Sequence, residues 1–221
     1  MSLKELKSQS EFPLFWRGVG VRLNNTGKRF NREWIFRHFS YEFVSGKSYA
    51  ITGPNGSGKS TLLQVIAGAL THNEGNIQYA IDNVQCSAVE QYKYIAIAAP
   101  YLELIEEMTA TEFFSFHRSF KALSVSNETA LQTVQLEKAA NKQIRYFSSG
   151  MKQRLKLAQA FFTNTPVLLL DEPSTNLDAD GIVLYHQLIN EYTKNKIVIV
   201  SSNDKQEYDF CEEIIEMGKY K

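Results

Sequence analysis

The sequence predicts an α/β fold with a helical insertion, and apolar runs along the chain support that prediction. Residues 48–52 form a short apolar run before a glycine-rich loop, and residues 62–70 then place apolar side chains at helical spacing. Residues 167–170 and 197–200 are two further apolar strands, with a helical stretch at 181–194 between them. Strands that alternate with helices imply a parallel sheet joined by right-handed crossovers.

The composition fits a folded domain and argues against several other classes of protein. The chain has 221 residues, is 43% hydrophobic, and carries 24 Lys and Arg against 24 Asp and Glu, so nothing suggests a nucleic-acid partner. No apolar run approaches the roughly 18 residues that span a bilayer, and the start at Met1 lacks the apolar region of a signal peptide. Cys86 and Cys211 are far apart and outside any metal-ligand spacing, so we expect reduced thiols in the cytoplasm.

The first part of the chain has the pattern of strands and turns. Residues 1–11 are polar, and we expect them to be flexible. From Phe12 to Phe43, apolar and aromatic runs alternate with turn residues, and a turn is expected at Asn24–Gly27. Phe30 has two interpretations, a packing residue of a hairpin or a platform for a nucleotide base.

From residue 101 to about residue 165 the pattern becomes helical. A strand over residues 94–99 is stopped by Pro100, and Thr109 with Glu112 three residues later is a capping box that starts a helix. We expect the aromatic face of this helix to pack internally, with a groove for a partner as the minority interpretation. That face comprises Phe113, Phe114, Phe116 and Phe120.

A phosphate-binding loop follows the strand at 48–52. Its residues are Gly53, Pro54, Asn55, Gly56, Ser57, Gly58, Lys59 and Ser60, followed by Thr61, and they match the pattern G-x-x-x-x-G-K-[ST]. The N–H groups of such a loop and the N-terminus of the next helix attract an anion, and Lys59 adds a positive charge. A plain glycine-rich turn is the alternative, but the flanking strand and helix argue against it. The sequence therefore predicts that a nucleotide binds here.

Two carboxylates end the apolar strand at 167–170. Asp171 and Glu172 lie at the carboxyl edge of the predicted sheet, where open α/β sheets bind ligands. Asp171 and the hydroxyl group of Ser60 suit Mg²⁺, and Glu172 suits a general base or a residue that orients water. A solvated loop is the alternative interpretation of this acidic pair.

A capped amphipathic helix precedes that strand. The stretch Phe147-Ser148-Ser149-Gly150-Met151 places Ser148 as the N-cap, and the free N–H groups behind it form a second site for an anion. Its apolar stripe comprises Met151, Leu155, Ala158 and Phe162. On its own the pattern is that of an ordinary capped helix.

Together, and in this order, the three motifs resemble those of the ATP-binding cassette (ABC) ATPases. The resemblance covers about Val19 to Met217 and implies a P-loop NTPase fold with a mixed sheet core, an antiparallel β-subdomain and a helical insertion. It implies a single ABC ATPase domain over 12–221. Residues 12–100 and 166–221 would form the nucleotide-binding core, and 101–165 the helical subdomain that contacts membrane-spanning partners.

The resemblance also implies a function and a set of contacts. The chain would hydrolyse ATP with Mg²⁺ and pair head to tail with a second cassette, as a homodimer or a heterodimer. Ser148, Ser149 and Gly150 would meet the γ-phosphate of the partner's ATP. Asp178 would line the interface, and Phe30 would stack on adenine. The pair would drive a separate membrane permease from the cytoplasmic face of the cell membrane.

Three regions depart from the family pattern. Asn203 stands where a histidine usually touches the γ-phosphate, and asparagine can donate a hydrogen bond but cannot shuttle a proton, so we expect slower hydrolysis. No glutamine follows Pro100 where the family has a metal-touching glutamine, and Glu103 is a candidate to act there through a water. The signature segment has Ser149 for glycine and Met151 for glutamine, which is a mild change.

Other functions stay open from the sequence. A soluble ABC-type ATPase of an assembly complex and a weakly hydrolysing regulatory cassette both fit the same motifs. A small-molecule P-loop kinase is disfavoured by the stretch at 147–151.

Overall fold

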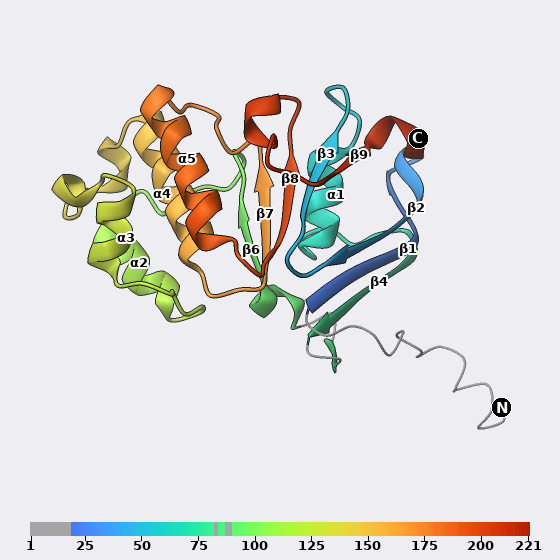
Figure 1. Ribbon diagram of the computed structural model, residues 1–221, viewed down its shortest axis with the longest axis horizontal. Coiled ribbons are helices and arrows are strands. Elements are labelled where there is room, and N and C mark those ends of the chain that lie inside the picture. The colour runs from blue at the N-terminus through green and yellow to red at the C-terminus, as the bar shows by residue number, and fades with distance from the viewer. Residues whose placement is uncertain (1–18, 82–83, 87–89) are drawn as a thin grey trace.

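The computed structural model describes residues 19–81, 84–86 and 90–221 and contains two sheets with helices around them (Figure 1). One sheet is antiparallel with strand order β2-β1-β4-β5, and the other is parallel with strand order β6-β7-β8-β3-β9. The α/β prediction is confirmed, and the two kinds of pairing lie in separate sheets. The predicted flexible segment 1–11 and the first residues of the predicted domain, 12–18, lie outside the described residues.

The elements follow each other as the sequence pattern predicts, with additional short strands. The strands are β1 (Val19–Phe30), β2 (Glu33–Val44), β3 (Ser48–Thr52), β4 (Glu74–Ile81), β5 (Val84–Cys86), β6 (Ile95–Ala98), β7 (Val167–Asp171), β8 (Ile197–Ser201) and β9 (Glu213–Glu216). The helices are α1 (Lys59–Ile66), α2 (Ala110–Arg118), α3 (Asn127–Thr133), α4 (Ser149–Phe162) and α5 (Ala179–Tyr192). Short 3₁₀ turns are η1 (Gln91–Tyr94), η2 (Glu137–Ala139), η3 (Ile144–Tyr146), η4 (Lys205–Glu207) and η5 (Met217–Tyr220). The predicted capping box is present at the start of α2.

The parallel sheet separates two apolar cores, because successive side chains of a strand point to opposite faces. Leu168 and Leu170 of β7 pack with residues of α2 to α5, whereas Val167 and Leu169 pack with α1 and the antiparallel sheet. The layers are therefore the helices, the parallel sheet, and α1 with the antiparallel sheet (Figure 1).

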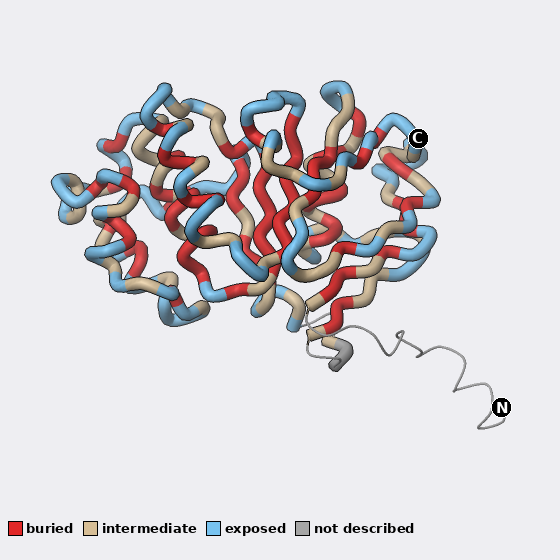
Figure 2. The backbone as a smooth tube through the Cα atoms, in the orientation of Figure 1, coloured by how far each residue is buried: buried red, intermediate tan, exposed pale blue. Residues whose placement is uncertain are grey.

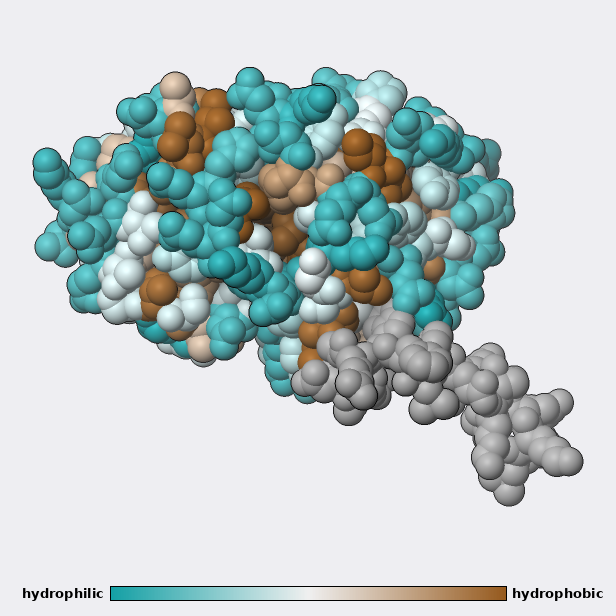
Figure 3. All heavy atoms as spheres, in the orientation of Figure 1, coloured by the Kyte–Doolittle hydropathy of each residue, from teal (hydrophilic) through white to brown (hydrophobic). Residues whose placement is uncertain are grey.

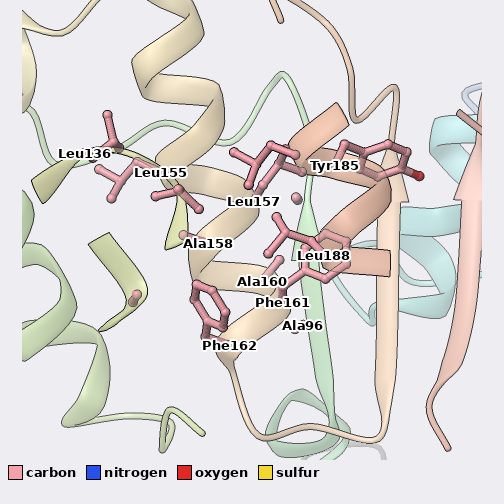
Figure 4. Packing of buried hydrophobic residues seen from close by; sticks show 14 of the residues in the cluster. Ala96, Leu136, Leu155, Leu157, Ala158, Ala160, Phe161, Phe162, Tyr185 and Leu188 are labelled. Carbon is pink, nitrogen blue, oxygen red and sulfur yellow. The ribbon is translucent and has the colours of Figure 1, made fainter. Parts of the chain in front are cut away.

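The helical core is built mainly on α4. Figure 4 shows Leu155 and Phe161 of α4 in one cluster with Tyr185 and Leu188 of α5. Buried residues concentrate along the central strands and on the inner sides of these helices (Figure 2). On the face drawn in Figure 3, hydrophobic residues form separate small patches among hydrophilic ones. Among the described helices, none combines the length and the apolar character that a bilayer crossing requires.

One predicted turn is instead part of a strand. Asn24–Gly27 lies inside β1, and the pairing of β1 with β2 is irregular between Leu23 and Arg29. Asn25 has a φ of 47°, a conformation that asparagine tolerates better than most residues. Polar residues and glycine mark a bulge here, and the sequence pattern does not distinguish a bulge from a turn.

The aromatic face predicted for α2 is only partly buried. Phe113 and Phe114 lie in the core, but Phe116 is 43% exposed and Phe120 is 66% exposed. Phe116 follows Phe114 by two residues, about 200° around an α-helix, so their rings cannot share a face. Phe120 lies beyond the end of the helix at Arg118, and its ring packs on that of Phe116 with centroids 5.1 Å apart. The prediction of internal packing was wrong for these two rings.

Candidate functional site

The phosphate loop joins β3 to α1 beside the parallel sheet. The ammonium group of Lys59 donates a hydrogen bond to the carbonyl of Gly53 at 2.8 Å. Gly58 precedes α1 with a φ of 97°, and no side chain bonds the first N–H groups of the helix. A Cβ at Gly58 would lie 2.7 Å from Cγ2 of Ile35, so glycine is required here. Those free N–H groups are available to a phosphate.

A hollow of about 330 Å³ lies over this loop. Its lining residues are Ile35, Asn55, Gly56, Gly58, Lys59, Ser60, Thr61 and Glu172. The structure thus brings most of the predicted loop together with the predicted catalytic carboxylate. Ser57 is buried beneath the loop at 1% exposure.

Asp171 at the end of β7 is 1% exposed. Burial raises the pKa of its carboxyl group, and the hydroxyl groups of Ser60 and Ser201 act in the opposite direction. The Oδ1 atom of Asp171 has no hydrogen-bond partner among the described residues. A buried carboxylate oxygen without a partner is costly, and a cation would satisfy it.

The donors near Asp171 fit Mg²⁺. This ion is commonly bound by one or two carboxylates together with phosphate oxygens of a substrate. The described residues contain no group of three or more His, Cys, Asp or Glu that could hold a metal by themselves. Asp171 and the hydroxyl of Ser60 therefore suit an ion whose remaining ligands come from a nucleotide and water.

Glu172 has an unusual backbone. Its φ is 42°, in the left-handed region that residues other than glycine seldom adopt. Its N–H donates to the carbonyl of Ser201 at 2.9 Å, and its carbonyl accepts from the N–H of Thr175 at 3.2 Å. With this backbone its side chain lines the hollow beside Lys59.

Asn203 contacts the phosphate loop directly. Its Oδ1 accepts from the N–H of Gly53 at 3.2 Å, and its Nδ2 donates to Oδ1 of Asn55 at 3.3 Å. The side chain does not line the hollow itself. In this structure Asn203 therefore bridges two residues of the loop that would hold phosphate.

The loop after β6 contributes a residue that sequence reasoning missed. Burial and the negative charge of Asp171 raise the pKa of Tyr101 to about 12, while a hydrogen bond with Gln64 of α1 lowers it. Glu103 instead lines a separate hollow of about 190 Å³ that includes His117. Tyr101, the residue after Pro100, is 44% exposed, and its hydroxyl group is coupled electrostatically to Asp171; no motif marks it.

The signature segment lies at a different place. Oγ of Ser148 accepts from the N–H of Met151 at 3.2 Å, which confirms the predicted N-cap of α4. Ser148 and Gly150 line a second hollow of about 620 Å³, which shares no residue with the first. Lys138, Lys142 and Arg154 also line this hollow with one acidic residue, Asp178, so basic residues predominate in it. Ser149 is exposed as the first residue of α4.

Two other predicted residues lie outside the phosphate hollow. Asp178 caps α5 through Gly181 and pairs with Arg154 at 2.9 Å, and both contacts hold the pKa of its carboxyl group below the usual range. Phe30 ends β1 and is 47% exposed, with Nζ of Lys28 5.0 Å from its ring centroid. An exposed ring with one cation near it remains free to stack on a further group.

Known proteins are similar to this chain in sequence. The family model described as ABC transporter matches residues 36–175. The uncharacterized ABC transporter ATP-binding protein YybJ of Bacillus subtilis (strain 168) is 28% identical over 202 residues, which are 90% of this chain and 92% of YybJ. The cytochrome c biogenesis ATP-binding export protein CcmA of Nitrobacter winogradskyi is 31% identical over 185 residues, 82% of this chain and 91% of CcmA.

A solved structure agrees with the fold and with the chemistry. The ATP-binding cassette MJ0796, in a dimeric post-hydrolysis state bound to ADP and Pi, superimposes with a TM-score of 0.75 and 27% identity. The match covers 89% of this chain and 93% of that cassette. The family match spans more than half of the chain and includes the phosphate loop, Asp171 at the end of β7 and Glu172 directly after it. The chain therefore belongs to the ABC transporter family, as an ATP-binding cassette that hydrolyses ATP.

Proposed function

We propose that this cassette uses ATP to close a head-to-tail dimer and that closure drives a separate membrane permease. The separation of the two hollows carries the proposal. Lys59 lines one and Ser148 lines the other, and no lining residue is common to both. An ATP held on the phosphate loop therefore needs a second cassette, identical or different, to meet a signature segment.

The residues of the phosphate hollow have distinct proposed roles. Lys59 and the N–H groups at the start of α1 bind the phosphates. Asp171 and Ser60 would hold Mg²⁺, which when bound neutralises charge on the phosphate oxygens. Glu172 orients the attacking water and accepts its proton. Phe30 stacks on the adenine ring.

The partner cassette completes the site. Ser148, Ser149 and Gly150 of the second chain offer the N-terminus of α4 to the γ-phosphate, and Asp178 lies at the interface. These contacts exist only in the closed dimer, so ATP favours the closed state by the free energy of the added contacts. Hydrolysis removes the γ-phosphate and with it those contacts, so the dimer opens.

The helical part of the chain is the proposed attachment to the permease. We propose one cassette domain over 12–221, with 101–165 as the segment that meets the membrane protein at the cytoplasmic face of the cell membrane. The exposed rings of Phe116 and Phe120 support this, because apolar rings held together at a surface are suited to an interface.

A weakly hydrolysing regulatory cassette is the second candidate. Asn203 favours it for two reasons. Its side chain occupies the N–H of Gly53, and it stands in place of a histidine, which could carry charge. A soluble ABC-type ATPase of an assembly complex is the third, and only the identity of the partner separates it from the transporter.

Purification from native membranes tests the transporter function. The tagged chain should retain a polytopic membrane protein after detergent extraction. The double change Phe116→Ser and Phe120→Ser should lose that protein and keep ATP binding, whereas Ile214→Ser, at a residue that is 60% exposed on β9, should keep both. Recovery of a soluble partner alone would contradict the transporter and favour the assembly ATPase.

A further inference from the structure

We propose that Gln153 and Glu207 are positioning residues that hold the catalytic carboxylate of Glu172 over the phosphate loop. This inference rests on the proposed role of Glu172 in hydrolysis. Neither residue lines the phosphate hollow, and each acts on the chain directly after Glu172.

The backbone of Glu172 needs such support. Its φ of 42° is unfavourable for a residue with a side chain, and such conformations persist only where the surroundings fix them. The N–H of Glu172 is held by the carbonyl of Ser201 on β8. That bond fixes the N-terminal side of the residue. On the other side the carbonyl of Glu172 accepts from the N–H of Thr175 at 3.2 Å, so the conformation depends on what holds the two residues between them, Pro173 and Ser174.

Gln153 holds the first residue after Glu172. It lies on α4, is 3% exposed, and its Nε2 donates to the carbonyl of Pro173 at 2.7 Å. Pro173 has no N–H, so its carbonyl is its only backbone group that can be held by a hydrogen bond. Because both groups are buried, leaving either one unpaired is costly, and the hydrogen bond is therefore maintained.

Glu207 holds the second residue after Glu172. It lies in η4, is 3% exposed, and its Oε1 accepts from both the N–H and the hydroxyl of Ser174, at 2.6 Å and 2.5 Å. Hydrogen bonds to a carboxylate are shorter and stronger than neutral ones. The carbonyl of Glu207 accepts in turn from the hydroxyl of Tyr185, which is fully buried on α5. The segment that follows Asn203 is thus fixed to the segment that follows Glu172.

The two side chains come from different elements and act on adjacent residues. Pro173 is held by α4 and Ser174 by η4, while β8 holds Glu172 itself. If either side chain no longer holds its residue, the backbone of Glu172 can relax out of the left-handed region, and its carboxylate then leaves the position beside Lys59. The helix that begins with the signature segment therefore also places the chain's own carboxylate.

The test compares turnover with nucleotide binding in the full chain. Gln153→Leu and Glu207→Leu keep the approximate size of each side chain and remove its hydrogen bonds. Each should lower kcat for ATP on the order of tenfold to a hundredfold, since a displacement of about 1 Å has an effect of that size. KM and the Kd for a fluorescent ATP analogue should stay within about twofold.

Matched controls and a conservative variant separate positioning from general damage. Gln187→Leu and Glu191→Leu on α5 make the same changes at exposed residues, and both should keep kcat. Glu207→Gln keeps an oxygen that can accept from the N–H of Ser174, so its kcat should return most of the way to that of the unaltered chain. If Glu207→Leu does not fold, Ser174→Ala removes one of the two bonds and should give a smaller fall in kcat at unchanged Kd.

Three results would overturn the inference. One is a kcat within twofold of the unaltered chain in folded Gln153→Leu and in Ser174→Ala. Another is a Kd that weakens as much as kcat falls, and the third is a kcat of Glu207→Gln that stays as low as that of Glu207→Leu. Glu172→Gln is measured in parallel: full turnover in that variant refutes the proposed role of Glu172, whereas a fall there with full turnover in Gln153→Leu refutes this inference alone.

Discussion

The phosphate loop and the signature segment both lie at the start of a helix, but they differ in the contacts that the rest of the chain makes with them. Side chains of the same chain bond the backbone of the phosphate loop. Lys59 donates to the carbonyl of Gly53, and Asn203 accepts from the N–H of the same residue. The signature segment has its N-cap at Ser148, but its exposed residue Ser149 and the basic hollow beside it are open to solvent.

The two segments therefore differ in how much of a binding site the chain itself supplies around each of them. Around the phosphate loop the chain supplies the carboxylates of Asp171 and Glu172 and the hydroxyl of Ser60. Around the signature segment it supplies the side chains of Lys138 and Lys142, which have no ion pair or hydrogen bond among the described residues. This contrast supports the proposal that one end of each cassette holds a nucleotide and that the other contacts the nucleotide of a second cassette.

Removing Glu172, the proposed base at the phosphate loop, should give the largest effect. Glu172→Gln keeps the shape and loses the proton acceptor, so we expect hydrolysis to fall on the order of a hundredfold or more. ATP binding should be preserved, because Lys59 and the loop are untouched. Steady-state phosphate release measures the first quantity and titration with a fluorescent analogue the second. Undiminished release would show that another group accepts the proton.

The next prediction distinguishes the phosphate loop from the signature segment by the affinity of one chain for ATP. Lys59→Met removes the charge beneath the phosphates and should weaken ATP binding by about 3 kcal/mol, on the order of a hundredfold in Kd. Ser149→Glu places a negative charge at the signature segment, so it should leave the Kd of the single chain unchanged and abolish hydrolysis. Isothermal titration of both variants checks this. Equal losses of affinity would mean that one chain uses both segments on one ATP.

A smaller effect is expected at Asn203. Asn203→His introduces a group that can carry charge near the phosphate loop, and we expect hydrolysis to rise about tenfold. This is below the full contribution of a general acid or base, because Glu172 is the proposed base. Asn203→Gln, which cannot titrate, is the matched control. If the histidine variant hydrolyses ATP no faster than the unaltered chain, the asparagine is not what slows it.

The smallest effect is a dependence of stability on pH at Asp171, the proposed metal ligand. Because the folded chain raises the pKa of Asp171, this group favours folding at low pH, and that contribution is lost as pH rises through the folded pKa. Without nucleotide or Mg²⁺, Asp171→Asn should therefore melt at a higher temperature than the unaltered chain near pH 7, and the difference should shrink below pH 4. Added Mg²⁺ and ATP should stabilise the unaltered chain more than the variant. A difference in melting temperature that does not vary with pH would show that the ionisation of Asp171 is not its cause.

The parts of the site that depend on neighbours in the sequence could be predicted from it. The phosphate loop is defined by residues 53–61 and their flanks, and Asp171 and Glu172 by the apolar strand before them. The same holds for the N-cap at Ser148. In each case the residues that create the geometry are covalently close.

The rest depends on contacts between distant residues, and no local pattern reveals those. Tyr101 is coupled electrostatically to Asp171, Gln153 bonds Pro173, and Glu207 bonds Ser174 only because the sheet order brings their segments together. The position of Phe120 beyond the end of α2 and the strand at Asn24–Gly27 were mispredicted for the related reason that helix length and strand register are set by packing.

The mass of the chain in solution tests the central claim, that one ATP needs two cassettes, most directly. Sedimentation equilibrium of Glu172→Gln should give 25.2 kDa without nucleotide and about twice that with ATP and Mg²⁺. Adding Ser149→Glu to the same chain should keep it at 25.2 kDa although ATP still binds. A Glu172→Gln chain that binds ATP at full occupancy and stays at 25.2 kDa would contradict the claim.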